Sequence, residues 1–395
     1  MGPVATYIGP LIAVAGLLVV AIVTLNLLQG NIPLLTTPKP GAGGVGGGDG
    51  GANATPAPSN IVVTPPDTVF DGSILYAKAG NLWVQTGTDA RQLTNNGNDS
   101  MPAYSADGKT IYFIRVRVGT AKFPTEGTKS RSWYDLFTPQ LMQMNADGTG
   151  AKAVLTGRFV QNGSTWFYWL RQPTPSPDGQ TIAVVSDGPN PLHSDIVLQT
   201  FNLASRKLVS LGLPESLSLG HQDPTWSPDG KFLYYVKNGR DGTKGAPQIY
   251  RYDVKAKKTR ALTGPGYLTP DASPDGRWLA ATRTDAFSTD VVILDASGTE
   301  VLRVTDDGHS FAPVWSPAGD ALAFLHLAGT SVDLRMVQLN QSSGGWAVTK
   351  TVDLTKVSGL DGTSRPSWFI PPDQLPAGSP APPSSAGSAA PSTAP

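Results

Sequence analysis

The chain has 395 residues, enough for one large domain or two ordinary ones, and it carries 30 basic and 30 acidic residues. This balance supplies neither the basic excess typical of nucleic-acid binding nor an acidic excess that would attract a charged partner. The sequence has no cysteine, which excludes disulfides, thiolate metal sites and cysteine nucleophiles.

The first 30 residues form an apolar segment without a charged side chain between Val4 and Leu28. A helix needs about 20 such residues to cross the hydrocarbon core of a membrane. A cleavable signal peptide is the alternative, but a charged n-region and a small-residue cleavage site are both missing. We therefore expect residues 1–30 to be an uncleaved, single-pass transmembrane anchor. Its orientation stays open, because only Lys39 follows it closely.

Two segments of low complexity flank the body of the chain. Residues 31–66 are rich in glycine, then in proline, threonine and alanine, and residues 371–395 are rich in proline, serine and alanine. Such compositions bury too little apolar surface to fold, so we expect a linker and a disordered tail.

The body, residues 67–370, is a repeat. A serine, a proline or alanine, and a short turn before a β-rich run recur about every 40 to 50 residues in its later copies, which is a propeller signature. The copies are Ser105-Ala-Asp-Gly-Lys, Ser176-Pro-Asp-Gly-Gln, Ser227-Pro-Asp-Gly-Lys, Ser273-Pro-Asp-Gly-Arg and Ser316-Pro-Ala-Gly-Asp. Asp-Gly pairs tolerate the backbone angles of tight hairpins, so turn formation explains these aspartates without a calcium site.

The ends of the repeat region complement each other. The run from Ser73 begins at the second strand of a blade, and Pro366-Ser-Trp368 forms a first strand that has no continuation. We expect these two strands to pair, which closes a ring of six four-stranded blades and removes the exposed sheet edges. The predicted fold is all-β, a six-bladed β-propeller. The aromatic residues one position before each turn (Tyr104, Trp226, Trp315 and Trp368) are expected to pack between blades.

These motifs resemble those of the TolB-type propeller family. Ser-Pro-Asp-Gly-Lys is the repeat mark of that family, and the segment from Met144 to Thr156 is similar to its third strand, turn and fourth strand. The resemblance implies the propeller fold and an extracytoplasmic location, but it does not specify a function, because related repeats occur in adaptors, sensors, peptidase propellers and oligogalacturonate lyases. The α/β domain that precedes the propeller in TolB has no counterpart in this sequence.

The loops that lead into the innermost strands carry polar and aromatic residues that we expect to meet at the funnel mouth of the ring. A rigid ring of such groups suits the binding of a peptide or small ligand. The set is Asp99, Arg171, His221, Gln222, Asp223, Tyr267, His309 and Arg365. A solvated channel without a ligand is the alternative.

A second candidate surface lies in the irregular second blade. It has an insertion from about Val116 to Ser132, followed by four consecutive aromatic residues, Trp166, Phe167, Tyr168 and Trp169. Aromatic clusters beside arginine are typical of protein interfaces. Packing of these rings onto their own blade is the alternative.

The sequence lacks a nucleophile elbow and a phosphate-binding glycine loop, and we expect neither a metal nor a cofactor. The four histidines (His193, His221, His309 and His326) are expected in exposed loops. The predicted function is a non-catalytic, membrane-tethered scaffold or sensor that binds a protein, peptide or glycan and no nucleic acid. A carbohydrate-active lyase or hydrolase with its site at the funnel mouth is the competing function.

Overall fold

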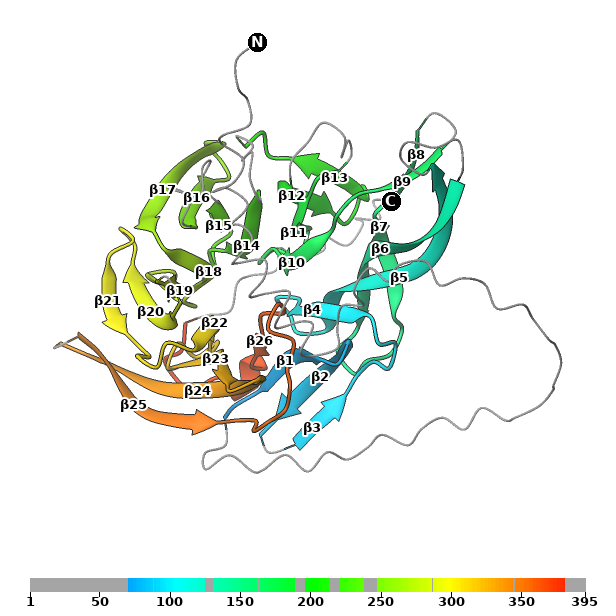
Figure 1. Ribbon diagram of the computed structural model, residues 1–395. Helices are drawn as coiled ribbons and strands as arrows, with labels where there is room; N and C mark the ends of the chain where they lie inside the picture. Colours follow the sequence, from blue (N-terminus) through cyan, green and yellow to red (C-terminus); the bar gives the residue numbers. More distant parts are fainter. Residues whose placement is uncertain are drawn as a thin grey trace, which may run out of the picture.

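The computed structural model describes residues 70–87, 89–124, 131–161, 164–188, 196–213, 220–237, 247–285, 287–343 and 345–380. These residues form six four-stranded antiparallel sheets arranged as blades around a ring (Figure 1). The predicted anchor (1–30) and linker (31–66) lie outside the described residues. Within the described ranges, no helix is long and apolar enough to cross a membrane.

Each blade runs from an innermost strand at the channel to an outermost strand at the rim. Blade I consists of β26 (Ser367–Phe369), β1 (Ser73–Lys78), β2 (Asn81–Thr86) and β3 (Asp89–Gln92). Blade II consists of β4 (Asp99–Tyr104), β5 (Thr110–Pro124), β6 (Arg131–Asn145) and β7 (Lys152–Thr156). Blade III consists of β10 (Arg171–Pro175), β11 (Thr181–Ser186), β12 (Val197–Asn202) and β13 (Lys207–Ser210). Blade IV consists of β14 (His221–Trp226), β15 (Phe232–Lys237), β16 (Gln248–Asp253) and β17 (Lys258–Pro265). Blade V consists of β18 (Tyr267–Ala272), β19 (Trp278–Thr284), β20 (Thr289–Asp295) and β21 (Glu300–Arg303). Blade VI consists of β22 (Ser310–Trp315), β23 (Ala321–Ala328), β24 (Ser331–Ser342) and β25 (Gly345–Asp353).

The ring closes as the sequence predicts. Strand β26 pairs antiparallel with β1, with Ser73 opposite Phe369 and Ile74 opposite Trp368. The Trp368 ring meets Phe70 edge-on at 5.5 Å, and its indole N–H donates to the Asp71 carbonyl. Blade I is therefore built from both ends of the body.

The core lies between blades and not within a single layer. Successive side chains of a strand point to opposite faces, so Leu75 packs towards blade II while Ile74 and Tyr76 pack towards blade VI. The described residues give one apolar cluster for each of the six blade interfaces. This is why the second and third strands read as apolar runs buried on both faces.

The repeated turns all lie on one side of the ring, which we call the turn face (the turns at 105–108, 176–179, 227–230, 273–276 and 316–319). In the first four, the aspartate carboxylate accepts a hydrogen bond from the serine hydroxyl and another from a backbone N–H two residues on. Gly108 has φ +68°, and a Cβ there would strike the Phe369 ring. The turn of blade VI has Ala318 in place of the aspartate, so it lacks the carboxylate that accepts these two hydrogen bonds in the other turns.

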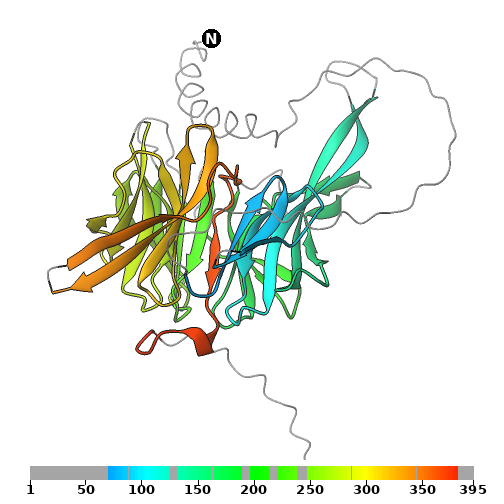
Figure 2. The same cartoon turned by 90° about the horizontal axis from the view of Figure 1, so that it is seen from below.

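Two features lie outside the blade plan. The β5–β6 hairpin rises from the face opposite the turns, and the short 3-10 helix η1 (Pro372–Gln374) lies under the turn face (Figure 2). A small hairpin, β8 (Arg158–Gln161) with β9 (Ser164–Phe167), precedes blade III. Leu375, after η1, packs against the apolar cluster between blades VI and I.

Candidate functional site

The innermost strands share a bulge that points polar groups into the channel. Met101, Gln172, Asp223, Thr269 and Ala312 occupy equivalent positions, have positive φ and precede a proline, and the pairing with the second strand shifts there in all five blades. Proline cannot donate to a ladder, so a bulge is the expected place for it. The bulge turns the N–H of each of these five residues away from its own blade.

Neighbouring blades accept these N–H groups one after another around the channel. Asp223 N donates to Gln172 Oε1 at 2.9 Å, and Thr269 N donates to Asp223 Oδ2 at 3.3 Å. Met101 N donates to the Ser364 hydroxyl at 3.0 Å, and Gln172 N to the sulfur of Met101. The polar groups that line the channel are thus largely engaged with one another.

Arg365 crosses the channel from blade I. Its guanidinium donates to the Pro224 carbonyl at 3.1 Å and to the Pro270 carbonyl at 2.6 Å, in blades IV and V, and lies 4.0 Å from the Asp271 carboxylate. Asp271 in turn accepts from Trp315 N and from the Thr225 hydroxyl. The crossing ties the closing strand to the opposite side of the ring and obstructs the channel at this level.

The acids around this arginine lie deep in the ring. Burial raises the pKa of Asp223 and of Asp271, and in both cases the positive charge of Arg365 is the largest opposing influence. Burial lowers the pKa of the Arg171 guanidinium, which is opposed by Asp223 and Asp361. The channel therefore holds half-buried charges of both signs that stabilise one another.

The structure separates the predicted funnel-mouth residues into two groups. Arg171, Asp223 and Arg365 come together in the channel, and Gln222, which precedes Asp223 in β14, is half-buried. Asp99 is fully buried and holds Arg115 through two hydrogen bonds of 2.6 and 2.8 Å, so it does not face the mouth. Tyr267 packs into the cluster between blades IV and V, with its hydroxyl 3.4 Å from Glu300.

The expectation of exposed histidines is wrong for His221 and His326, which are 2% and 7% exposed. His221 Nδ1 accepts from Leu198 N, and its ring lies 4.8 Å from that of Tyr235. His326 contacts Ser310 and Asp307 through Nδ1, and its ring is 6.4 Å from that of His309. His193 lies outside the described residues. Within the described ranges, no three His, Asp or Glu side chains form a group that could hold a metal.

The aromatic run of blade II is divided. Tyr168 is 8% exposed and packs between blades II and III, Phe167 is half-buried, and Trp169 is 55% exposed. The side chain of Trp166 lies outside what the structure describes. The described residues of the insertion, 116–124 and 131–132, belong to the outer part of the β5–β6 hairpin, where Trp133 is exposed and stacks with Lys122 at 5.0 Å. Only part of the predicted interface is therefore free to meet a partner.

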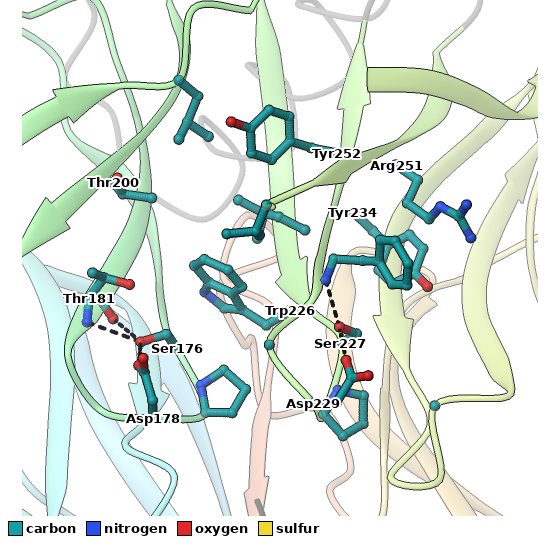
Figure 3. Close-up of a pocket in the computed structure, with 18 of the residues that line it drawn as sticks. Ser176, Asp178, Thr181, Thr200, Trp226, Ser227, Asp229, Tyr234, Arg251 and Tyr252 are labelled. Atoms are coloured by element: carbon teal, nitrogen blue, oxygen red, sulfur yellow. Dashed lines mark hydrogen bonds between the residues drawn. The ribbon is translucent and has the colours of Figure 1, made fainter. Parts of the chain in front are cut away.

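A groove that no sequence motif predicts lies on the turn face between blades III and IV. It reaches from Thr181 and Thr200 of blade III to Tyr252 of blade IV (Figure 3) and continues to the blade V turn at residues 274–276, and it encloses about 960 Å³ in all. The Trp226 ring lies between the two walls, and its indole N–H donates to the Thr174 carbonyl at 3.1 Å. We call this the III/IV groove. Its other lining residues include the turn prolines Pro177, Pro228 and Pro274.

The blade IV side of the III/IV groove is basic. Lys257 lines it, whereas Arg251 lies on the face of blade IV turned towards blade V, where its guanidinium stacks on the Phe232 ring at 4.3 Å. Asp229, which also lines it, already pairs with Lys231 at 2.8 Å. Further exposed cations are Lys255 in the turn before β17 and Lys258 and Arg260 in β17 itself. An open apolar floor with a basic wall can bind an elongated partner.

Sequence comparison adds the relatives of this chain. Residues 161–353 match the family model described as the TolB beta propeller domain. An uncharacterized protein of Agrobacterium fabrum is 32% identical over 210 residues, which are 51% of this chain and 66% of that protein. The uncharacterized peptidase YuxL of Bacillus subtilis is 28% identical over 239 residues, 55% of this chain but only 29% of YuxL.

Comparison of structures gives the same fold. TolB from Acinetobacter baumannii superimposes with a TM-score of 0.53 at 19% identity, over 76% of this chain and 67% of that one. A putative TolB from Agrobacterium tumefaciens gives 0.51 at 19% identity, over 77% of this chain and 95% of that one. At this identity the likeness concerns the fold alone. Together with the matched family model and the six closed blades, it leads to one conclusion: the chain belongs to the TolB-type β-propeller family.

Proposed function

We propose that this protein is a non-catalytic binding scaffold or sensor, tethered to a membrane by residues 1–30, whose propeller binds a protein, peptide or glycan outside the cytoplasm. The observation that carries this proposal is the contrast between the channel and the III/IV groove. Arg365 occupies the channel and bonds to both Pro224 and Pro270, whereas the groove is open and bordered by exposed cations. The partner surface is therefore on the turn face.

The competing function, a carbohydrate-active lyase or hydrolase at the funnel mouth, has less support. Such a site would gather acid–base or metal-binding groups around one substrate. His221 is buried against Tyr235 at the III/IV interface, while His309 and His326 neighbour each other in blade VI. The half-buried acid Asp223 already accepts hydrogen bonds from Gln172 and Thr269.

A photo-reactive amino acid in place of Val254 tests the binding function in intact cells that produce the full chain. Val254 lines the groove and is 38% exposed, and Val301, 40% exposed in blade V, is a matched control. We expect a covalent adduct from position 254 that mass spectrometry identifies and that position 301 does not form. Equal labelling at the two positions, or none at either, would contradict the proposal.

The compartment has a separate test. Added protease should digest the propeller of intact cells if it lies outside the cytoplasm, while a cytoplasmic marker protein stays whole. Protection of the propeller until the cells are lysed would overturn this part of the proposal.

A further inference from the structure

The ring contains a filled counterpart of the III/IV groove. Trp315 in blade VI has the same register as Trp226 in blade IV, because each pairs with the leucine that follows the first residue of its second strand. Between blades V and VI, the Trp315 ring packs 5.7 Å from Trp346, and Trp346 packs edge-on 5.7 Å from Trp278. Trp346 is delivered by the extended β24–β25 hairpin. This interface is therefore filled by an aromatic side chain on an extended strand.

The same position is unfilled between blades III and IV. Thr181 stands at the first position of β11, where β19 has Trp278, so this wall is lower by a whole indole ring. The turn between β16 and β17 is short, and β17 carries no aromatic residue that could play the part of Trp346. The floor residue Trp226 is kept, but both rings that would cover it are missing. The III/IV groove is the result.

An aromatic side chain from another molecule would restore the missing packing. Trp226 and Pro177 offer flat apolar surfaces, and aromatic pairs gain from edge-to-face and offset contacts at ring separations of about 4.5 to 7 Å. The contact of Trp346 with Trp315 shows that such an arrangement is compatible with this ring.

The charge around the groove selects the rest of the ligand. Lys257 lines the groove in the turn after β16, where Lys255 is also exposed, and Lys258 and Arg260 are exposed in β17. Arg251 lies on the face of blade IV that is turned towards blade V. Two of the lining acids are already paired within the protein, Asp229 with Lys231 and Asp275 with Arg277. The blade IV wall is therefore positive and favours carboxylates beside the inserted ring, whereas the third lining acid, Asp178 of blade III, accepts hydrogen bonds from Ser176 and Gln180.

The flanking segments of this chain do not have the required chemistry. Residues 31–69 and 381–395 contain no Phe, Tyr or Trp, and residues 381–395 also contain no charge. These segments carry no ring that could be inserted, and we therefore assign the aromatic side chain to a partner protein.

We propose that the III/IV groove binds an extended acidic peptide of a partner protein, with one aromatic side chain, tryptophan by preference, inserted over Trp226 between blades III and IV. This inference rests on the proposed binding function and specifies the partner that the groove accepts.

The test uses the full chain in detergent and a fluorescein-labelled nonapeptide, Glu-Thr-Glu-Thr-Trp-Thr-Glu-Thr-Glu, with fluorescence anisotropy as the readout. We expect saturable binding that weakens at least tenfold when alanine replaces the tryptophan, or lysine the glutamates. Thr181→Trp should fill the groove as Trp278 does and weaken binding at least tenfold. Thr110→Trp, at the same register in blade II, should not. Lys257→Glu, an exposed change, should weaken binding severalfold and reduce its dependence on salt.

Several outcomes would overturn the inference. They are equal affinity for the peptide with alanine, unchanged binding by both Thr181→Trp and Lys257→Glu, no binding of the nonapeptide, or its displacement by an unlabelled copy of residues 381–395. If the adduct at position 254 still forms while the nonapeptide fails to bind, the binding function stands and only the chemistry assigned to the partner is wrong.

Discussion

Replacement of Arg365 by methionine tests whether the crossing of the channel stabilises the ring. The guanidinium makes hydrogen bonds of 3.1 and 2.6 Å to the carbonyls of Pro224 and Pro270. Hydrogen bonds to charged groups contribute about 1.5–3 kcal/mol each, and water that enters the channel would replace part of that. We therefore expect Arg365→Met to lower the free energy of unfolding by about 2–4 kcal/mol. At roughly 2–4 °C per kcal/mol for a large domain, the Tm falls by about 4–16 °C.

The loss of unfolding free energy in Arg365→Met should depend on pH in a defined direction. Burial raises the pKa of Asp223 and Asp271, and Arg365 opposes that rise in both. A carboxyl whose pKa is higher in the folded state than in the unfolded state destabilises the fold when it is ionised, and protonation relieves this as the pH falls through the folded pKa. Without Arg365 both pKa values rise further, so the deficit of the variant should be smaller at pH 5.0 than at pH 7.5.

Urea denaturation at both pH values, followed by circular dichroism, measures this effect. Arg365→Lys keeps the positive charge but loses the guanidinium that donates to two carbonyls at once. Its free energy of unfolding should therefore lie between those of the wild type and of the methionine variant. Arg260→Met, an exposed change in β17, is the matched control and should be nearly neutral. Stability within 0.5 kcal/mol of wild type for Arg365→Met, or a larger deficit at pH 5.0, would refute the reasoning.

Three further changes follow from the fold, each measured by urea denaturation of the full chain. Ala318→Asp should stabilise the protein by about 1 kcal/mol, because it gives the blade VI turn the two side-chain bonds of the other turns, and a neutral or harmful effect would contradict this. Deletion of residues 363–380 should destabilise the whole ring whereas deletion of 381–395 should not, and equal midpoints for the two deletions would disprove closure by β26. Asp99→Ala should cost about 3–5 kcal/mol, because it leaves Arg115 partly buried without its partner, and a cost below 1 kcal/mol would show that water replaces the carboxylate readily.

The repeats made the architecture predictable from sequence. The turn residues give the blade count, and the incomplete strands at Ser73 and Trp368 give the closure, because each lacks the partner that the other supplies. The x-Pro pair before each innermost strand end was a signal for the bulges, since proline in a central strand has to be accommodated in this way.

The candidate sites were less predictable, and the reason is physical. Whether a polar residue at the start of an innermost strand meets solvent depends on the neighbouring blade. Asp99 and Arg365 occupy similar places in their repeats, but Asp99 pairs with Arg115 of its own blade, whereas Arg365 crosses the ring. The III/IV groove arises from what is missing, a ring at Thr181 and another beyond β17. No local pattern marks an omission, although comparison of Thr181 with Trp278 across the aligned repeats would have revealed it.

The composite blade I also sets the order in which the molecule can mature. Strand β1 is made first and β26 last, so β1 has no inner partner until nearly the whole body has been synthesised. During that interval the channel-side edge of blade I is exposed, and the apolar surface between blades VI and I is uncovered. Any factor that shields β1 during synthesis would raise the yield of folded protein, and any pause before residue 367 would prolong the period in which two nascent chains can pair by mistake.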